Sequence, residues 1–169
     1  HHGTMSDAER NQFLGNISGD AERLSALVGR LMDLARADMA QPDRHVSVAL
    51  EPLLAKVADA MRGGSFTVDL AIKTPLAAAA MDAAALESVL ITVLENARQA
   101  GATQVLIEAS AKLRDIQLDI SDNGPGIAPT DAERLFEPFF TTRRAEGGTG
   151  LGLAIARALV EAHSGRMEL

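Results

Sequence analysis

The sequence of 169 residues contains no cysteine, no tryptophan and no tyrosine, and only five residues are phenylalanine. Without cysteine the chain forms neither disulfides nor thiolate metal sites, which fits a reducing compartment. With so few aromatic residues, the core has to be built from aliphatic side chains and methionine. No apolar run approaches the roughly 18 residues that cross a bilayer, so we expect no membrane contact by this chain.

Positive charge is also scarce, because the formal net charge is −7. Such a chain repels nucleic acids and anionic membranes, so we expect no nucleic acid as a partner. A nucleotide is still compatible with this charge, because the backbone amides of a glycine loop and a bound cation outweigh a diffuse negative field. Residues 1–5, which begin His1-His2-Gly3-Thr4, read as a tag or cloning remnant and are excluded from the fold.

Residues 7–40 are predicted to hold one long helix, because apolar side chains recur at steps of three and four. The stripe consists of Phe13, Ile17, Ala21, Leu24, Leu27, Val28, Leu31, Leu34 and Ala35. A lone helix of this kind is not stable in water, so the stripe has to pack on a partner. We expect it to form a homodimer; a simple connecting helix is the alternative interpretation.

Residues 44–169 are predicted to form a second domain that alternates short strands and helices. We expect helices at 50–61, 83–100 and 150–163, and strands at 45–49, 65–72, 77–81, 104–109, 116–121 and 166–169. Strands 104–109 and 116–121 are joined by a short turn and should be antiparallel. The pattern predicts an α/β fold, an α+β sandwich with a mixed sheet and helices on one face. Because the chain ends on an expected interior strand, we expect the natural protein to continue or a neighbour to cover that edge.

The expected helix 83–100, with Asp82 as its N-cap, carries a polar stripe beside its apolar one. The stripe consists of Thr92, Glu95, Asn96 and Gln99. A polar stripe usually faces water, but this one lacks long charged side chains. The amide oxygen of Asn96 suits a hard cation such as Mg²⁺, which takes few protein ligands.

Two glycine-rich segments follow, Asp122-Asn123-Gly124-Pro125-Gly126-Ile127 and Gly147–Leu153. The first reads either as a plain turn or as a site in which a buried Asp122 carboxylate accepts a hydrogen bond from the amine of adenine. The second opens a helix, and its backbone amides can bind an anion. It is not a P-loop, because no Lys followed by Ser or Thr comes after the last glycine, and no strand leads into it as a dinucleotide fingerprint requires.

Between the two loops lies the segment Leu135–Thr142, which holds three of the five phenylalanines. It reads either as a plug for the core or as the anchor of a lid that runs from Thr141 to Gly148. Arg143 and Arg144 on this lid either reach phosphates or are simply solvated.

These four motifs, in this order, resemble the catalytic and ATP-binding domain of two-component sensor histidine kinases, within the superfamily that includes gyrase and heat-shock chaperone ATPases. Asn96 and its helix resemble the N box, and Asp122–Ile127 the first glycine box. Leu135–Phe139 resembles the F box, and Gly148–Leu153 the second glycine box. Residues 12–38 are similar to the second helix of the family's dimerisation and histidine-phosphotransfer hairpin.

The resemblance implies a Bergerat-type ATP site. Asp122 would bind the adenine amine, Gly124 and Gly126 would let the base and ribose lie against the backbone, and Asn96 would ligate Mg²⁺ between the phosphates. The other nucleotide-binding positions that the resemblance implies are Gln99, Ile127, Phe139, Thr142, Gly148, Thr149, Gly150, Leu151, Gly152 and Leu153.

The sequence departs from the family in several respects: Thr92 stands where the family often has a further asparagine, the final strands of the family fold are absent, and two more departures bear on phosphoryl transfer. The first hairpin helix, with its phospho-accepting histidine, is missing, and neither His45 nor His163 has the acceptor's context. Gln99 stands where many members have a lysine that contacts phosphate. The resemblance therefore implies a cytoplasmic protein-histidine kinase domain whose parent, membrane-anchored or not, works with a response regulator receiver domain. This chain itself should bind ATP and ADP without phosphorylating itself.

Two alternatives stay open. The chain could be a nucleotide-binding module for dimerisation or regulation that transfers no phosphate. It could also be an ATPase of the same superfamily, in which a glutamate one turn before the asparagine activates water. Thr92 holds that position and Glu95 is out of register, which disfavours hydrolysis.

Overall fold

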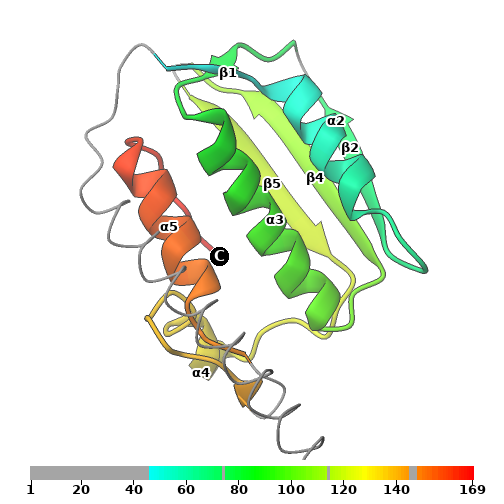
Figure 1. Ribbon diagram of the computed structural model, residues 1–169, viewed down its shortest axis with the longest axis vertical. Helices are drawn as coiled ribbons and strands as arrows, with labels where there is room; N and C mark the ends of the chain where they lie inside the picture. The colour runs from blue at the N-terminus through cyan, green and yellow to red at the C-terminus, as the bar shows by residue number, and fades with distance from the viewer. Residues whose placement is uncertain (1–45, 74, 114, 145–147) are drawn as a thin grey trace, which may run out of the picture.

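The computed structural model describes residues 46–73, 75–113, 115–144 and 148–169 (Figure 1). The helix expected in residues 7–40, the homodimer contact assigned to it and His45 lie outside these residues. The elements in chain order are β1 (Val48–Ala49), α2 (Leu50–Met61), β2 (Thr67–Ile72), β3 (Ala78–Ala79), α3 (Ala83–Gln99), β4 (Gln104–Ala111), β5 (Ile116–Asp122), α4 (Pro129–Ala132) and α5 (Gly152–Ala162).

The main sheet is mixed, as the sequence predicts. Its strand order is β2-β4-β5, with β2 parallel and β5 antiparallel to β4. The short strands β1 and β3 pair separately in an antiparallel two-stranded sheet, which the sequence pattern does not predict. None of the described helices is long and apolar enough to cross a membrane.

One face of the sheet is covered by α2 and α3, and α5 lies alongside α3 (Figure 1). Strand side chains alternate between two faces, so Val105, Ile107 and Ala109 of β4 are buried under the helices. On the other face, Leu106 is 38% exposed. The helices therefore enclose one core layer, and the opposite face of the sheet meets solvent.

The exposed face carries paired charges. Lys73 Nζ lies 2.8 Å from Glu108 Oε1. The hydrogen bond that Lys73 donates to Glu108 and the negative charge of Glu108, with a smaller contribution from Asp119, raise the pKa of Lys73 above its usual value. The pair therefore stabilises the fold at neutral pH, and this contribution disappears as pH rises through the raised pKa. Because the ammonium group is exposed, the contribution is small.

One expectation about the second half of the chain is wrong, and one short helix in it is not predicted by the sequence. Residues 166–169 form no strand, because the chain turns at Ser164, whose φ is 62°, and Gly165 N donates to Val160 O to close α5. Residues 166–169 share no ladder with β5 among the described residues, and a strand requires such a partner. The short helix α4 was not expected, although its N-terminal Pro129 is a common first helical residue.

Asn123 clamps the end of β5 to the loop between α3 and β4. Its Oδ1 accepts hydrogen bonds from the backbone N–H groups of Thr103 and Gln104, each at 2.9 Å, and its Nδ2 donates to Thr103 Oγ1 at 3.0 Å. Its own backbone N–H donates to Gln104 O. The clamp fixes where Asp122 stands relative to the end of α3.

The variant Asn123→Ala removes these three side-chain hydrogen bonds. It should lower the free energy of unfolding by about 1–3 kcal/mol, measured by urea unfolding. Gln117→Ala is the control, because that amide donates one bond to Asp119 on the exposed face and should change stability by less than about 0.5 kcal/mol. Equal losses in both variants would show that Asn123 does not hold the loop.

Candidate functional site

Helix α3 supplies both a core stripe and one wall of the site. It starts at Asp82, whose carboxylate accepts a hydrogen bond from Ala85 N, as the N-cap prediction requires. Its buried side chains are Leu86, Val89, Leu90, Leu94 and Ala97. The polar stripe on its other side is only partly buried at Asn96 and exposed at Gln99. Helical spacing keeps the two stripes apart.

Within the polar stripe, Glu95 and Asn96 differ in what they already bind. Glu95 holds Arg98 at 2.7 Å and accepts from Gln99 Nε2 at 3.3 Å. The side-chain amide of Asn96 has no hydrogen-bond partner among the residues that the structure describes. The Asn96 oxygen is thus available to a ligand, whereas the Glu95 carboxylate is occupied.

Asp122 ends β5 on the face of the sheet that the helices cover. It stands opposite Val105 in the β4–β5 ladder, and directly opposed residues share a face. Its carboxylate is exposed rather than buried, which corrects the expectation, because it is the last residue of an edge strand. One oxygen accepts from Gly124 N at 2.7 Å; the other has no partner within the described part of the chain.

In the first glycine loop, Gly124 is close to Asp122, whereas the backbone at Gly126 is open. A Cβ on Gly124 would lie 2.7 Å from Asp122 Oδ1 and 3.5 Å from the Cβ of Ala102, just after α3. Gly126 has a φ of +75°, and a Cβ there would meet nothing within 4 Å. Ile127 is 45% exposed. A flat ligand can therefore approach this backbone beside Asp122.

The second glycine loop packs tightly against its neighbours. A Cβ on Gly150, whose φ is +67°, would lie 2.5 Å from the carbonyl carbon of Phe139, and Phe139 N donates to Gly150 O. A Cβ on Gly152, the first residue of α5, would lie 3.2 Å from Thr92 of α3. The loop and the N-terminus of α5 therefore face the polar stripe of α3, where helix amides favour an anion.

The other described residues of the second glycine loop differ in their burial. Leu151 is fully buried, and its N–H donates to Thr149 Oγ1 at 3.4 Å. Gly148 and Leu153 are partly buried. Thr142, further back on the lid, is exposed and has no hydrogen bond or ion pair with any described residue. The second glycine loop thus lies against α3 and the phenylalanine segment, whereas Thr142 has no hydrogen bond to any described residue.

The phenylalanine segment does not plug the core. Phe139 is 53% exposed with a φ of 68°, an unusual conformation for a bulky residue. Phe136 and Phe140 are partly buried, each beneath an arginine, Arg157 at 5.1 Å and Arg134 at 4.4 Å. The segment is instead the support on which the second glycine loop rests.

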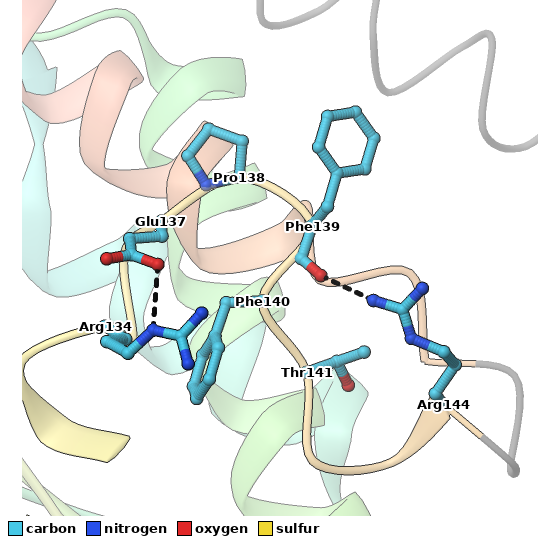
Figure 2. Close-up of a pocket in the computed structure, with 7 residues that line it drawn as sticks. All are labelled: Arg134, Glu137, Pro138, Phe139, Phe140, Thr141 and Arg144. Atoms are coloured by element: carbon cyan, nitrogen blue, oxygen red, sulfur yellow. Dashed lines mark hydrogen bonds and ion pairs between the residues drawn. The ribbon is translucent and has the colours of Figure 1, made fainter. Parts of the chain in front are cut away.

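A cavity of about 310 Å³ lies on the outer side of this segment (Figure 2). It is lined by Arg134, Glu137, Pro138, Phe139, Phe140, Thr141 and Arg144. Only Phe139 among these is a predicted site residue, and its ring points away from the cavity in Figure 2. Neither Asn96, Asp122 nor a described residue of the two glycine loops lines this cavity.

A metal ion at this site would need ligands from outside the protein. Among the described residues, no three His, Cys, Asp or Glu side chains gather to hold a metal. Mg²⁺ commonly keeps several waters and is bound through one or two protein oxygens plus substrate phosphates. The unoccupied amide oxygen of Asn96 therefore fits Mg²⁺ carried in with phosphates.

Over residues 81–169 the chain matches the family described as histidine kinase-, DNA gyrase B-, and HSP90-like ATPase. It is 35% identical to the sensor protein KdpD of Escherichia coli K12 across 82% of this chain, and 28% identical to the sensor histidine kinase CpxA of that strain across 90%. Its structure resembles the ATP binding domain of PrrB from Mycobacterium tuberculosis, with 28% identity and a TM-score of 0.60, over 73% of this chain and 85% of that one.

The chain spans only 16% of KdpD and 35% of CpxA. It therefore corresponds to one part of much longer proteins.

The tight contact at Gly150 yields a stability prediction. Gly150→Ala places a Cβ against the Phe139 backbone at a positive φ, so it should lower the free energy of unfolding by more than about 2 kcal/mol. Gly63→Ala is the matched control, because a Cβ there meets nothing within 4 Å, and it should be neutral or slightly stabilising. Chemical denaturation measures both. Indistinguishable values would contradict the packing described here.

Proposed function

Because this chain belongs to the histidine kinase-, DNA gyrase B-, and HSP90-like ATPase family, we propose that the site between α3, the end of β5 and the start of α5 binds ATP for phosphoryl transfer to a histidine. The chain is the catalytic ATP-binding domain of a sensor histidine kinase. One observation carries the proposal for the site. The Asn96 amide oxygen on α3 and one Asp122 carboxylate oxygen at the end of β5 have no partner among the described residues, and both lie with the N-terminus of α5 on the helix-covered side of the sheet.

Asp122 recognises the base. Its unpaired oxygen accepts a hydrogen bond from the exocyclic amine of adenine, while its other oxygen stays on Gly124 N. Guanine carries a carbonyl at the corresponding position, which an acceptor repels. The open backbone at Gly126, with Ile127 beside it, gives the base and ribose a surface to lie on.

The second glycine loop and α5 hold the phosphates. Backbone amides of residues 148–153, at the N-terminus of α5, donate to phosphate oxygens. Asn96 would hold Mg²⁺, which would neutralise charge on the phosphates. Phosphoryl transfer depends mainly on positioning and charge stabilisation, so this chain needs no nucleophile of its own; the acceptor is a histidine imidazole on another segment of the parent protein.

Hydrolysis is disfavoured by the state of Glu95. A general base has to reach the attacking water, but both carboxylate oxygens of Glu95 are engaged by neighbours on α3. Thr92, one turn before Asn96, has its methyl group directed at Gly152. The site therefore lacks a base for water and suits transfer to a separate acceptor.

The parent protein is proposed to act as a homodimer joined through residues 7–40, whose apolar stripe requires a partner. A response regulator receiver domain then takes the phosphoryl group from the histidine. We place this domain in the cytoplasm, where ATP is available, whether or not the parent is anchored in a membrane.

Nucleotide binding should depend on the Asp122 carboxylate. Mg-ADP at about 100 times its dissociation constant should add roughly 2.7 kcal/mol to the stability of the chain. Asp122→Asn should weaken binding at least about tenfold, because an amide cannot replace the charged acceptor. Asp119→Asn, on the same strand but on its exposed face, should bind as the unchanged chain does. The proposal for the base site fails if calorimetry gives the same dissociation constant for both variants.

The magnesium role of Asn96 is tested separately. The unchanged chain should bind ADP more tightly in excess Mg²⁺ than in EDTA, and Asn96→Ala should reduce this difference about tenfold. Binding in EDTA should be unaffected, which serves as the internal control for folding. A variant that keeps the full response to Mg²⁺ would exclude Asn96 as the ligand.

A further inference from the structure

The two neighbouring arginines of the lid point to different parts of the molecule. Arg143 Nη2 donates to Gln99 Oε1 on α3 at 2.9 Å. Arg144 Nη2 donates to Phe139 O at 3.1 Å and lines the outer cavity (Figure 2). From the sequence, either arginine could be a phosphate ligand or a solvated side chain. The structure gives the two arginines different partners.

Gln99 is oriented to receive Arg143. Its Nε2 donates to Glu95 Oε2 at 3.3 Å, and the other Glu95 oxygen holds Arg98 at 2.7 Å. The amide of Gln99 therefore presents its oxygen to the lid. Arg98 already compensates the charge of Glu95, so the bond to Gln99 holds Arg143 without neutralising it.

Arg143 is also fixed by its backbone, next to the second glycine loop. Its N–H donates to Thr141 Oγ1 at 3.1 Å, and its carbonyl accepts from Gly148 N at 3.0 Å. The residue is partly buried, and no carboxylate lies within ion-pair distance of it among the described residues. Arg143 is thus held at Gly148 by its backbone and at Gln99 by its guanidinium, which has no carboxylate partner in the described part of the chain.

We propose that Arg143 binds the phosphate groups of the nucleotide and that Gln99 is the residue that positions it. The inference rests on the proposed function, since it assumes that a nucleotide occupies this site. Gln99 lies three residues after Asn96 on α3, and such residues are neighbours on a helix surface. The guanidinium therefore lies next to the proposed Mg²⁺ ligand.

The pair explains the departure at position 99. The positive charge that a lysine brings there in many family members is supplied here from the lid. A guanidinium has five N–H donors, so it can keep its bond to Gln99 while it donates to phosphate oxygens. A carboxylate at position 99 would compete with phosphate for the charge, and a lysine would repel Arg143.

The test compares Mg-ADP with adenosine, which lacks phosphates, on single variants of the 169-residue chain. Arg143→Gln should bind ADP about tenfold more weakly, with adenosine binding unchanged. Arg144→Gln is the matched control and should leave both dissociation constants as they are. Isothermal titration calorimetry measures the dissociation constant of ADP, and competition against ADP measures that of adenosine. Equal weakening of ADP and adenosine by Arg143→Gln, or no weakening at all, would overturn the phosphate role.

Two further variants test the positioning role of Gln99. As a single variant, Gln99→Ala should weaken the binding of ADP and leave that of adenosine unchanged. In the Arg143→Gln background it should cause no further loss of ADP affinity, because the two residues act through one contact. Gln99→Lys in the Arg143→Gln background should recover most of the lost ADP affinity by returning the charge to α3. Additive losses together with no recovery would overturn the role of Gln99.

The design separates this inference from the proposed function. If the unchanged chain bound neither ADP nor adenosine, the proposed nucleotide site itself would be wrong. If the unchanged chain bound both ligands and Asp122→Asn weakened the binding of both, an Arg143→Gln variant with unchanged affinities would contradict only the inference about the lid.

Discussion

The register between β4 and β5 is the constraint on which the site depends. It places Asp122 opposite Val105 and therefore on the side of the sheet that α2 and α3 cover. A slip of one residue would turn this carboxylate to the solvent face and expose the apolar side chains of β5. The hydrogen bonds of Asn123 to the loop after α3 hold the strand end at this register. The stability of the sheet and the position of the Asp122 carboxylate, which is the proposed base-binding group, thus depend on the same few bonds.

Helix α3 joins the core to the chemistry. Its buried stripe fixes its rotation on the sheet, and this rotation points Asn96 and Gln99 toward the lid and α5. At the other end of the site, Gly150 is pressed against the backbone of Phe139. Close packing therefore surrounds the Asn96 amide oxygen and one Asp122 carboxylate oxygen, which have no partner among the described residues. Such fixed polar groups are what a preorganised binding site requires.

Much of the fold follows from the sequence, because it rests on local periodicity. The helix 50–61, the cap at Asp82 and the antiparallel hairpin are all confirmed, whereas the site residues that the motifs indicate stay a prediction. Long-range contacts are not visible in that way. The strand expected at 166–169 is wrong, because alternation cannot show whether a neighbour accepts the backbone bonds. The hydrogen bonds of Asn123 and the bond between Arg143 and Gln99 join residues about 20 or more positions apart, which no local pattern encodes. The exposure of Asp122 likewise depends on β5 lying at the edge of the sheet.

The hydrogen bond from Gly148 to Arg143 closes the lid at its base. The bond therefore fixes the backbone of Arg143 whatever the number of residues between it and Gly148. The entropy of closing a loop grows only with the logarithm of its length. An insertion between these two residues should therefore cost little stability and leave the hydrogen bond from Arg143 to Gln99 in place.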